Sequence, residues 1–159
     1  MRRQHLPPDI AYAITSPMRV VLDTNILVGA LLRNGGASRE ILRLCLEQNI
    51  TPVIGTALFI EMEDVLSRRD LFQKCRIDAN ERDELFRAFL SCTEWTPIYY
   101  SWRPNLRDEA DNHIVDLAIA GNASYIITQN ERDFQKMSLL FPDLEIINAA
   151  EFLKMWRTL

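Results

Sequence analysis

Short apolar runs alternate with amphipathic helical patterns along most of this chain. Runs typical of buried strands occupy residues 20–22, 50–54, 93–100, 125–127 and 144–147. Between them, apolar residues recur at helical spacing and predict helices over residues 26–31, 38–47, 56–68, 78–90, 111–120, 134–140 and 149–156. This alternation predicts an α/β fold with three layers, α/β/α, around a central parallel sheet of about four or five strands.

Local signals mark the boundaries of several of these elements. Ser38 is expected to cap the helix that follows it, and Gly121 is expected to close the helix that begins at Asp111. Residues 1–17 contain three prolines and no apolar periodicity. We therefore expect an amino-terminal extension over 1–17 and one domain over 18–159.

Polar side chains follow the first and fourth predicted strands directly. Asp23 comes straight after Val20-Val21-Leu22, at the carboxyl end of a first strand, which is where open α/β sheets bind their ligands. An alternative interpretation is that Asp23 or Asn25 only caps the next helix. After the fourth strand, Thr128 and Asn130 would lie beside Asp23 if the two strands are neighbours. The alternative there is a plain turn with Asp133 as a helix cap.

Further acids lie on the predicted helices. Asp111 points within the apolar face of its helix, either as a helix cap or as a metal ligand at the sheet edge. Asp108, one turn upstream, suits either role, and Asp116 on the opposite face is expected to be solvated. In the helix that opens at Thr56, Glu61 and Glu63 lie on the two borders of the apolar face, and periodicity does not choose between them.

Composition narrows the class of protein. No apolar run of the 159 residues approaches the ~20 that a membrane span needs, and no apolar segment follows the basic start as in a signal peptide. Three widely spaced cysteines suit a reducing compartment, so we expect a cytoplasmic protein without membrane contact. The net charge of −4 does not by itself indicate nucleic-acid binding, although phosphate contacts need only a local basic patch.

Basic side chains are candidates for contacts to nucleic-acid phosphates, and aromatic side chains are candidates for stacking on unpaired bases. A solvated surface is the more usual explanation of the basic residues, and core or interface packing is the more usual explanation of the aromatic ones. His113 is expected at the surface without a catalytic partner. The basic candidates are Arg33, Arg39, Arg43, Arg68, Arg69, Lys74, Arg76, Arg103, Arg107, Arg132 and Lys136, and the aromatic ones are Tyr99, Tyr100 and Trp102.

Four stretches together resemble the PIN-domain family, whose members include the toxins of bacterial toxin–antitoxin pairs. They are Val21-Leu22-Asp23-Thr24-Asn25, Glu61-Met62-Glu63-Asp64-Val65-Leu66, Asp108-Glu109-Ala110-Asp111 leading into Leu117-Ala118, and the run YIITQNERDF from Tyr125 to Phe134. Each motif is short, but their order and spacing are fairly specific. The family pattern favours Glu61 over Glu63 as the second acid and places the third at Asp111. Where many members carry a fourth aspartate this chain has Asn130, followed by Asp133 as in other members.

The resemblance implies a Rossmann-like PIN fold and a Mg²⁺- or Mn²⁺-dependent endoribonuclease. Asp23 and Asp111 would be the principal metal ligands, and Glu61 would bind a second ion or position water. Asn130, Thr128 and Asp133 would surround them, with Asn25 and Asp108 in support. Hard divalent cations relieve the repulsion between clustered carboxylates and take oxygen ligands of this kind. The implied partners are an RNA substrate, an antitoxin protein and a second copy of the chain, with Trp95, Trp102 or Trp156 at the homodimer interface.

Two other hypotheses belong to different classes. The first is a degenerate PIN-like domain that binds RNA or a protein without cutting, which the asparagine at position 130 keeps open. The second is an aspartyl-phosphate phosphatase, which ranks low because it would normally carry a second acid where this chain has Asn25. No glycine-rich phosphate loop is found in the sequence.

Overall fold

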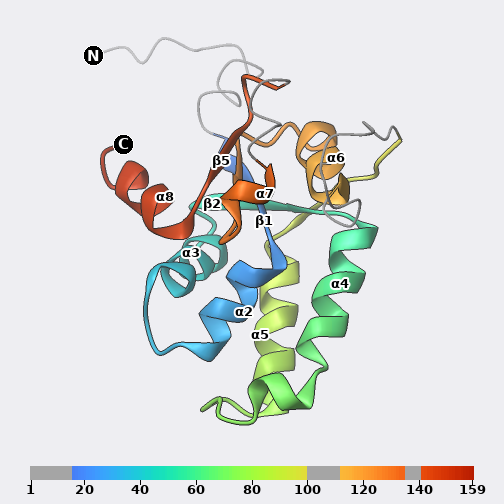
Figure 1. Cartoon of the computed structure of the whole chain (residues 1–159), viewed down its shortest axis with the longest axis vertical. Coiled ribbons are helices and arrows are strands. Elements are labelled where there is room, and N and C mark those ends of the chain that lie inside the picture. Colours follow the sequence, from blue (N-terminus) through green and yellow to red (C-terminus); the bar gives the residue numbers. More distant parts are fainter. Residues whose placement is uncertain (1–15, 100–111, 135–140) are drawn as a thin grey trace, which may run out of the picture.

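A parallel sheet of five strands forms the centre of the computed structural model, which describes residues 16–99, 112–134 and 141–159 (Figure 1). The strand order is β3-β2-β1-β4-β5. The strands are β1 (Met18–Leu22), β2 (Ile50–Ile54), β3 (Glu94–Trp95), β4 (Tyr125–Ile127) and β5 (Glu145–Ile147). The prediction of a three-layer α/β/α fold with four or five parallel strands is confirmed.

Helices connect and cover these strands. Figure 1 shows α3 and α8 on one side of the sheet and α6 on the other, while α4 and α5 run side by side away from it. α6 packs against β1, β2 and β4, and α3 packs against β2 and α8. The described helices are α2 (Thr24–Leu32), α3 (Ala37–Leu46), α4 (Thr56–Leu66), the 3₁₀ helix η1 (Arg69–Phe72), α5 (Ala79–Ser91), α6 (Asn112–Ala120), α7 (Glu131–Phe134) and α8 (Ala149–Trp156).

The central strand β1 sets the geometry of the sheet edge. Val20, Val21 and Leu22 are almost completely buried, because helices cover both faces of this strand. β1 pairs with β4 in a register that places Leu22 opposite Ile127. The residues that follow these two strands, Asp23 and Thr128, therefore meet at the same edge. None of the described helices combines the length and apolar character needed to cross a membrane.

The third strand is much shorter than predicted. The sequence predicted a strand over 93–100, but β3 contains only Glu94 and Trp95. The amide of Thr96 makes the last bond to this edge, donating to Ile54 O at 2.8 Å, and Pro97 follows with no N–H to continue the ladder. Tyr100 lies outside the described residues.

The predicted end of α6 at residue 120 is confirmed, but two predicted capping residues were wrong. Ser38 does not cap α3, because Gly36 occupies the N-cap and Ser38 is buried inside the first turn. Gly121 does not supply the left-handed residue after α6; that residue is Asn122, with φ of 49°. Gly121 is needed for a different reason, since a Cβ built on it would lie 2.5 Å from Val53 Cγ1.

Helix α6 is buried on more than one face, which overturns a prediction for one acid. Asp116 was expected in solvent, opposite the apolar face, but it is only 5% exposed. The helix contacts β1, β2, β4 and α4, and its buried residues lie on more than one face, so a division into one buried and one solvated face does not describe it.

Several predictions fall outside the described residues. These are the placements of Asp108 and Asp111, most of the amino-terminal extension, the helix predicted over 134–140 beyond Phe134, and Trp102. α7 itself begins at Glu131, earlier than the helix expected there.

Candidate functional site

Asp23 lies at the carboxyl end of β1 and faces the end of β4. Its Oδ2 accepts a hydrogen bond from Thr128 Oγ1 at 2.7 Å and another from Asn25 Nδ2 at 3.1 Å. Its backbone N–H donates to Ile127 O at 3.0 Å, which continues the pairing of the two strands. Asp23 is 8% exposed. A buried carboxylate is thus held at the sheet edge by donors from two segments far apart in the sequence.

Helix capping does not explain Asp23. It occupies the N-cap position of α2, but its side chain makes no capping hydrogen bond to that helix. Asn25, the other candidate cap, uses its amide to link Asp23 to the β4 end. Its Nδ2 donates to Asp23, and its Oδ1 accepts from the backbone N–H of Gln129 at 3.2 Å. The interpretation of these residues as simple caps was therefore wrong.

The surroundings of Asp23 disfavour its charged form. Burial raises the pKa of the Asp23 carboxyl above its ordinary value of 3.8, and the negative charge of Glu61 raises the pKa further. The hydrogen bond from Thr128 acts in the opposite direction, because it stabilises the carboxylate. A cation bound beside Asp23 would relieve the cost of burying its charge.

Glu61 on α4 comes to the same edge as Asp23. Its Oε2 accepts from Thr24 Oγ1 at 3.0 Å, and Thr24 directly follows Asp23 in the chain. The same oxygen lies 3.5 Å from His113 Nε2 on the second residue of α6. His113, expected at the surface without a partner, thus lies against an acid of the site, and its side chain is 24% exposed. Helical phase gave no signal for this pairing, which depends on how α6 docks on α4.

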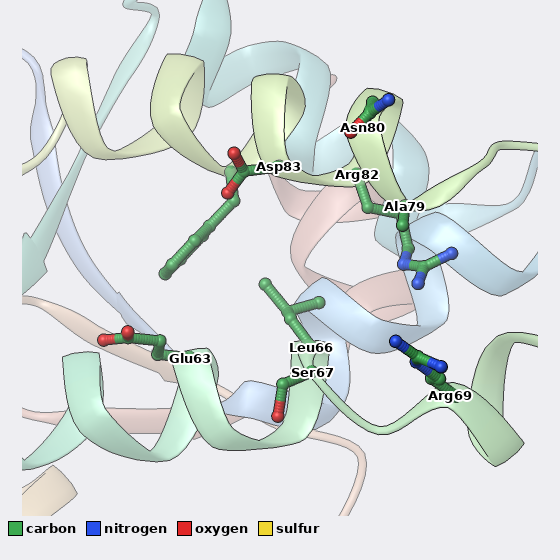
Figure 2. A pocket seen from close by; sticks show the side chains of 9 residues that line it. Glu63, Leu66, Ser67, Arg69, Ala79, Asn80, Arg82 and Asp83 are labelled. Atoms are coloured by element: carbon green, nitrogen blue, oxygen red, sulfur yellow. The ribbon is translucent and has the colours of Figure 1, made fainter.

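Glu63 is placed elsewhere. It is exposed and lines a cleft between α4 and α5, together with Leu66, Arg82 and Asp83. Figure 2 shows Glu63 at the end of this cleft opposite Arg82 and Arg69. Of the two borderline glutamates, the structure therefore brings Glu61 to Asp23 and leaves Glu63 outside.

The segment after β4 contributes its backbone and one hydroxyl. Thr128 is fully buried, and its Oγ1 also accepts from the backbone N–H of Asn130 at 3.0 Å. The side chains of Asn130 and Asp133 are exposed, and no hydrogen bond joins either to Asp23. Asp133 lies within α7 rather than at its N-cap, so the interpretation of Asp133 as a cap was wrong.

The described residues do not by themselves contain a complete metal-binding cluster. Among residues 16–99, 112–134 and 141–159, no group of three or more His, Cys, Asp or Glu side chains is arranged to hold an ion. Asp23 and Glu61 are two hard oxygen donors of the kind that Mg²⁺ and Mn²⁺ accept. The start of α6 also carries an unsatisfied buried acceptor, Asn112 Oδ1. The donor chemistry present therefore fits a hard divalent cation.

Two of the basic candidates pair with neighbouring acids. Arg43 forms ion pairs with Glu40 and Glu47, and Arg68 pairs with Asp64 at 2.7 Å. Arg33 forms no ion pair with a described residue, and it lines a cavity that Asn25 also lines. Arg103, Arg107 and Lys136 lie outside the described residues.

Comparisons with known proteins agree with the geometry of the fold. One matching solved structure, described as "Crystal structure of VapBC2 from Rickettsia felis bound to a DNA fragment from their promoter", has a TM-score of 0.55 and 23% sequence identity. The match covers 82% of this chain and 98% of that chain. No curated protein matches. The family model described as "PIN domain" matches residues 19–132, a span that includes Asp23, Glu61 and Thr128, and the chain therefore belongs to the PIN-domain family.

Proposed function

We propose that this protein is a Mg²⁺- or Mn²⁺-dependent endoribonuclease that hydrolyses RNA phosphodiester bonds and leaves a 5′-phosphate and a 3′-hydroxyl. The single observation that carries the proposal is the buried Asp23 carboxylate, held at the sheet edge by Thr128 and Asn25 with Glu61 beside it. Burial of a carboxylate is costly unless a partner compensates for it, and a divalent cation with a bound phosphate is such a partner.

Each side chain has a distinct role in this proposal. Asp23 and Asp111 hold the ion, which when bound supplies a polarised phosphate and an acidified water. Glu61 binds a second ion or positions the attacking water, and Thr24 fixes the orientation of its carboxylate. Thr128 and Asn25 orient Asp23 by donating to its Oδ2, and the hydrogen bond from Thr128 lowers the pKa of Asp23. Asn130, Asp133 and Asp108 complete the outer part of the site.

A second candidate function is an RNA- or protein-binding PIN domain that does not cut. The amide of Asn130 favours it, because a neutral side chain there adds no charge for an ion. Metal binding distinguishes the two candidate functions, because a ligand that binds the native state raises the melting temperature of the protein. The nuclease predicts such a shift with Mn²⁺, and the shift should disappear in Asp23→Asn.

We further propose that the nuclease acts as the toxin of a toxin–antitoxin pair in the cytoplasm. Support for the toxin role comes from the similarity in fold to the structure described as VapBC2 bound to a DNA fragment from their promoter. A basic side chain of an antitoxin, most simply an arginine, would pair with Asp23 and Glu61 and displace the ion. The chain would also form a homodimer, for which the exposed Trp95 is a candidate contact.

The decisive experiment is RNA cleavage by the purified protein with and without Mn²⁺. Asp23→Asn and Asp111→Asn should each abolish cleavage while circular dichroism shows the native helix content. Full activity in either variant removes that residue from the site.

In cells, expression of the chain alone should slow growth, and Asp23→Asn or a small protein encoded beside it should relieve the effect. Harmless expression of an active wild-type enzyme would leave the nuclease and exclude the toxin.

A further inference from the structure

A cavity of about 500 Å³ lies next to the acidic site and has no role in the mechanism above. It is formed by α2, the loop after it, the start of α3, Gln129 and the start of α8, and we call it the α2–α8 cavity. It shares a wall with the site. Asn25 lines the cavity and also donates to Asp23, and Gln129 lines it while its backbone N–H donates to Asn25.

The α2–α8 cavity does not share the negative charge of the acidic site. None of its lining residues is an acid, and Arg33 at its edge forms no ion pair with a described residue. This is unusual in a chain whose net charge is −4 and whose two described site acids lie close by. A neutral to positive cavity beside clustered carboxylates suits a segment of a polyanion better than a cation.

Two polar side chains that line the cavity, Gln129 and Asn148, each have one group without a hydrogen-bond partner among the described residues. Gln129 Nε2 donates to Ser38 Oγ at 3.2 Å, which orients the amide, while Gln129 Oε1 accepts no hydrogen bond from a described residue. Asn148 Oδ1 caps α8 by accepting from Glu151 N, but the Asn148 Nδ2 group donates to none of the described residues. One acceptor and one donor of fixed orientation are therefore open to a ligand.

The remaining walls are apolar or bare backbone. Val28, Leu32 and Ala150 line the cavity, and Leu32 is 40% exposed although it is a large apolar residue. Gly35 and Gly36 have φ near +100°, and nothing lies within 4 Å of a Cβ built on either, so the loop leaves this side open. Apolar walls with a few oriented polar groups are what proteins use to hold an unpaired base and read its edge.

We propose that the α2–α8 cavity binds one unpaired base of the RNA strand next to the scissile phosphate and thereby sets the base preference of cleavage. The inference rests on the proposed function, because it places the bound strand across Asp23. Gln129 and Asn148 contact the edge of the base, Leu32 packs against its face, and Arg33 neutralises an adjoining phosphate.

Binding is tested first, without cleavage, with the four nucleoside 5′-monophosphates added to ¹⁵N-labelled protein in EDTA. We expect one monophosphate to bind most tightly, with chemical shift changes at the amides of Gly35, Gly36, Ser38 and Gln129. Ala150→Trp fills the mouth of the cavity from an exposed helical position and should weaken this binding about tenfold or more. Ala88→Trp, at an exposed position on α5, is the matched control and should leave it unchanged.

Specificity is tested next by sequencing the cleavage products of a randomised RNA with Mn²⁺. Gln129→Leu keeps the backbone N–H that holds Asn25 but removes the amide, so the preferred base should lose about tenfold or more of its advantage. Cleavage with an unchanged base preference in both Gln129→Leu and Ala150→Trp, or shifts confined to other surfaces, would overturn the cavity proposal and leave the nuclease intact. Nucleotide binding in the cavity without any cleavage would support the base-binding site and would overturn the nuclease, together with the role of the cavity in choosing the cleaved base.

Discussion

Thr128 Oγ1 donates to Asp23 Oδ2 at 2.7 Å and joins the end of β4 to the end of β1. The same hydroxyl accepts from Asn130 N, so one buried group orients an acid and the loop beside it. Thr128→Val keeps the shape but removes these two bonds and a longer one that the hydroxyl accepts from Asn25 Nδ2 at 3.4 Å, and it should cost about 1–3 kcal/mol of unfolding free energy. Because this hydrogen bond lowers the pKa of Asp23, the acid limb of the rate profile should move to higher pH.

Thr128→Ser is the control for that prediction, because it keeps the hydroxyl. Urea unfolding and the pH dependence of kcat/KM measure the two effects. A valine variant with wild-type stability and an unmoved acid limb would show that the hydroxyl does not support Asp23.

Asp23→Asn should raise the melting temperature at pH 7 in EDTA, even though it abolishes cleavage. Burial raises the pKa of Asp23 in the folded state, so the native protein binds more protons than the unfolded chain between pH 3.8 and that raised value. Stability contributed by Asp23 is therefore present below this window and is lost as the pH rises through it. The advantage of Asp23→Asn should shrink when the pH is lowered below 3.8, and Asp143→Asn, at an exposed acid, is the matched control.

Glu61→Gln should reduce cleavage far more than Glu63→Gln. Glu61 contacts Thr24 and His113 at the sheet edge, whereas Glu63 lines the separate cleft between α4 and α5. Single-turnover cleavage at matched Mn²⁺ concentrations measures the difference, and circular dichroism checks the fold. Equal losses, or a larger loss for Glu63→Gln, would contradict the placement of Glu61 in the site.

Gly121→Ala should destabilise the protein by about 1–3 kcal/mol, because overpacking forces neighbours to move. The new Cβ would lie 2.5 Å from Val53 Cγ1 and 3.1 Å from Leu117 O. The double variant Gly121→Ala with Val53→Ala should cost less than the sum of the single changes, since Val53→Ala removes the nearest atom. Additive costs in urea unfolding would mean that the clash with Val53 is not the cause.

Deletion of residues 1–17 should leave folding and cleavage unchanged, because β1 begins at Met18 and the deleted segment lacks apolar periodicity. The truncated and full-length chains should unfold within about 1 kcal/mol of each other. A larger loss of stability would show that the extension packs on the domain.

The order and type of the elements could be predicted from the sequence because they depend on local pattern. Val20-Val21-Leu22, Ile50–Ile54 and Tyr125–Ile127 are apolar runs that only a strand covered on both faces accommodates well. Asp23 directly follows the first of these runs and Thr128 directly follows the last, so both lie at the carboxyl edge of a parallel sheet. That these two residues touch required β1 and β4 to be neighbours, which the strand order β2-β1-β4 decided.

Contacts between helices were decided by tertiary packing alone. Glu61 and Glu63 are equally placed on the periodicity of α4, and only the docking of α6 brings His113 against Glu61. Asp116 is buried, although the helical pattern puts it opposite the apolar face, so α6 is covered on more than one face. Helical periodicity describes one buried stripe, so it predicts a surface helix well and fails where a second element covers another face.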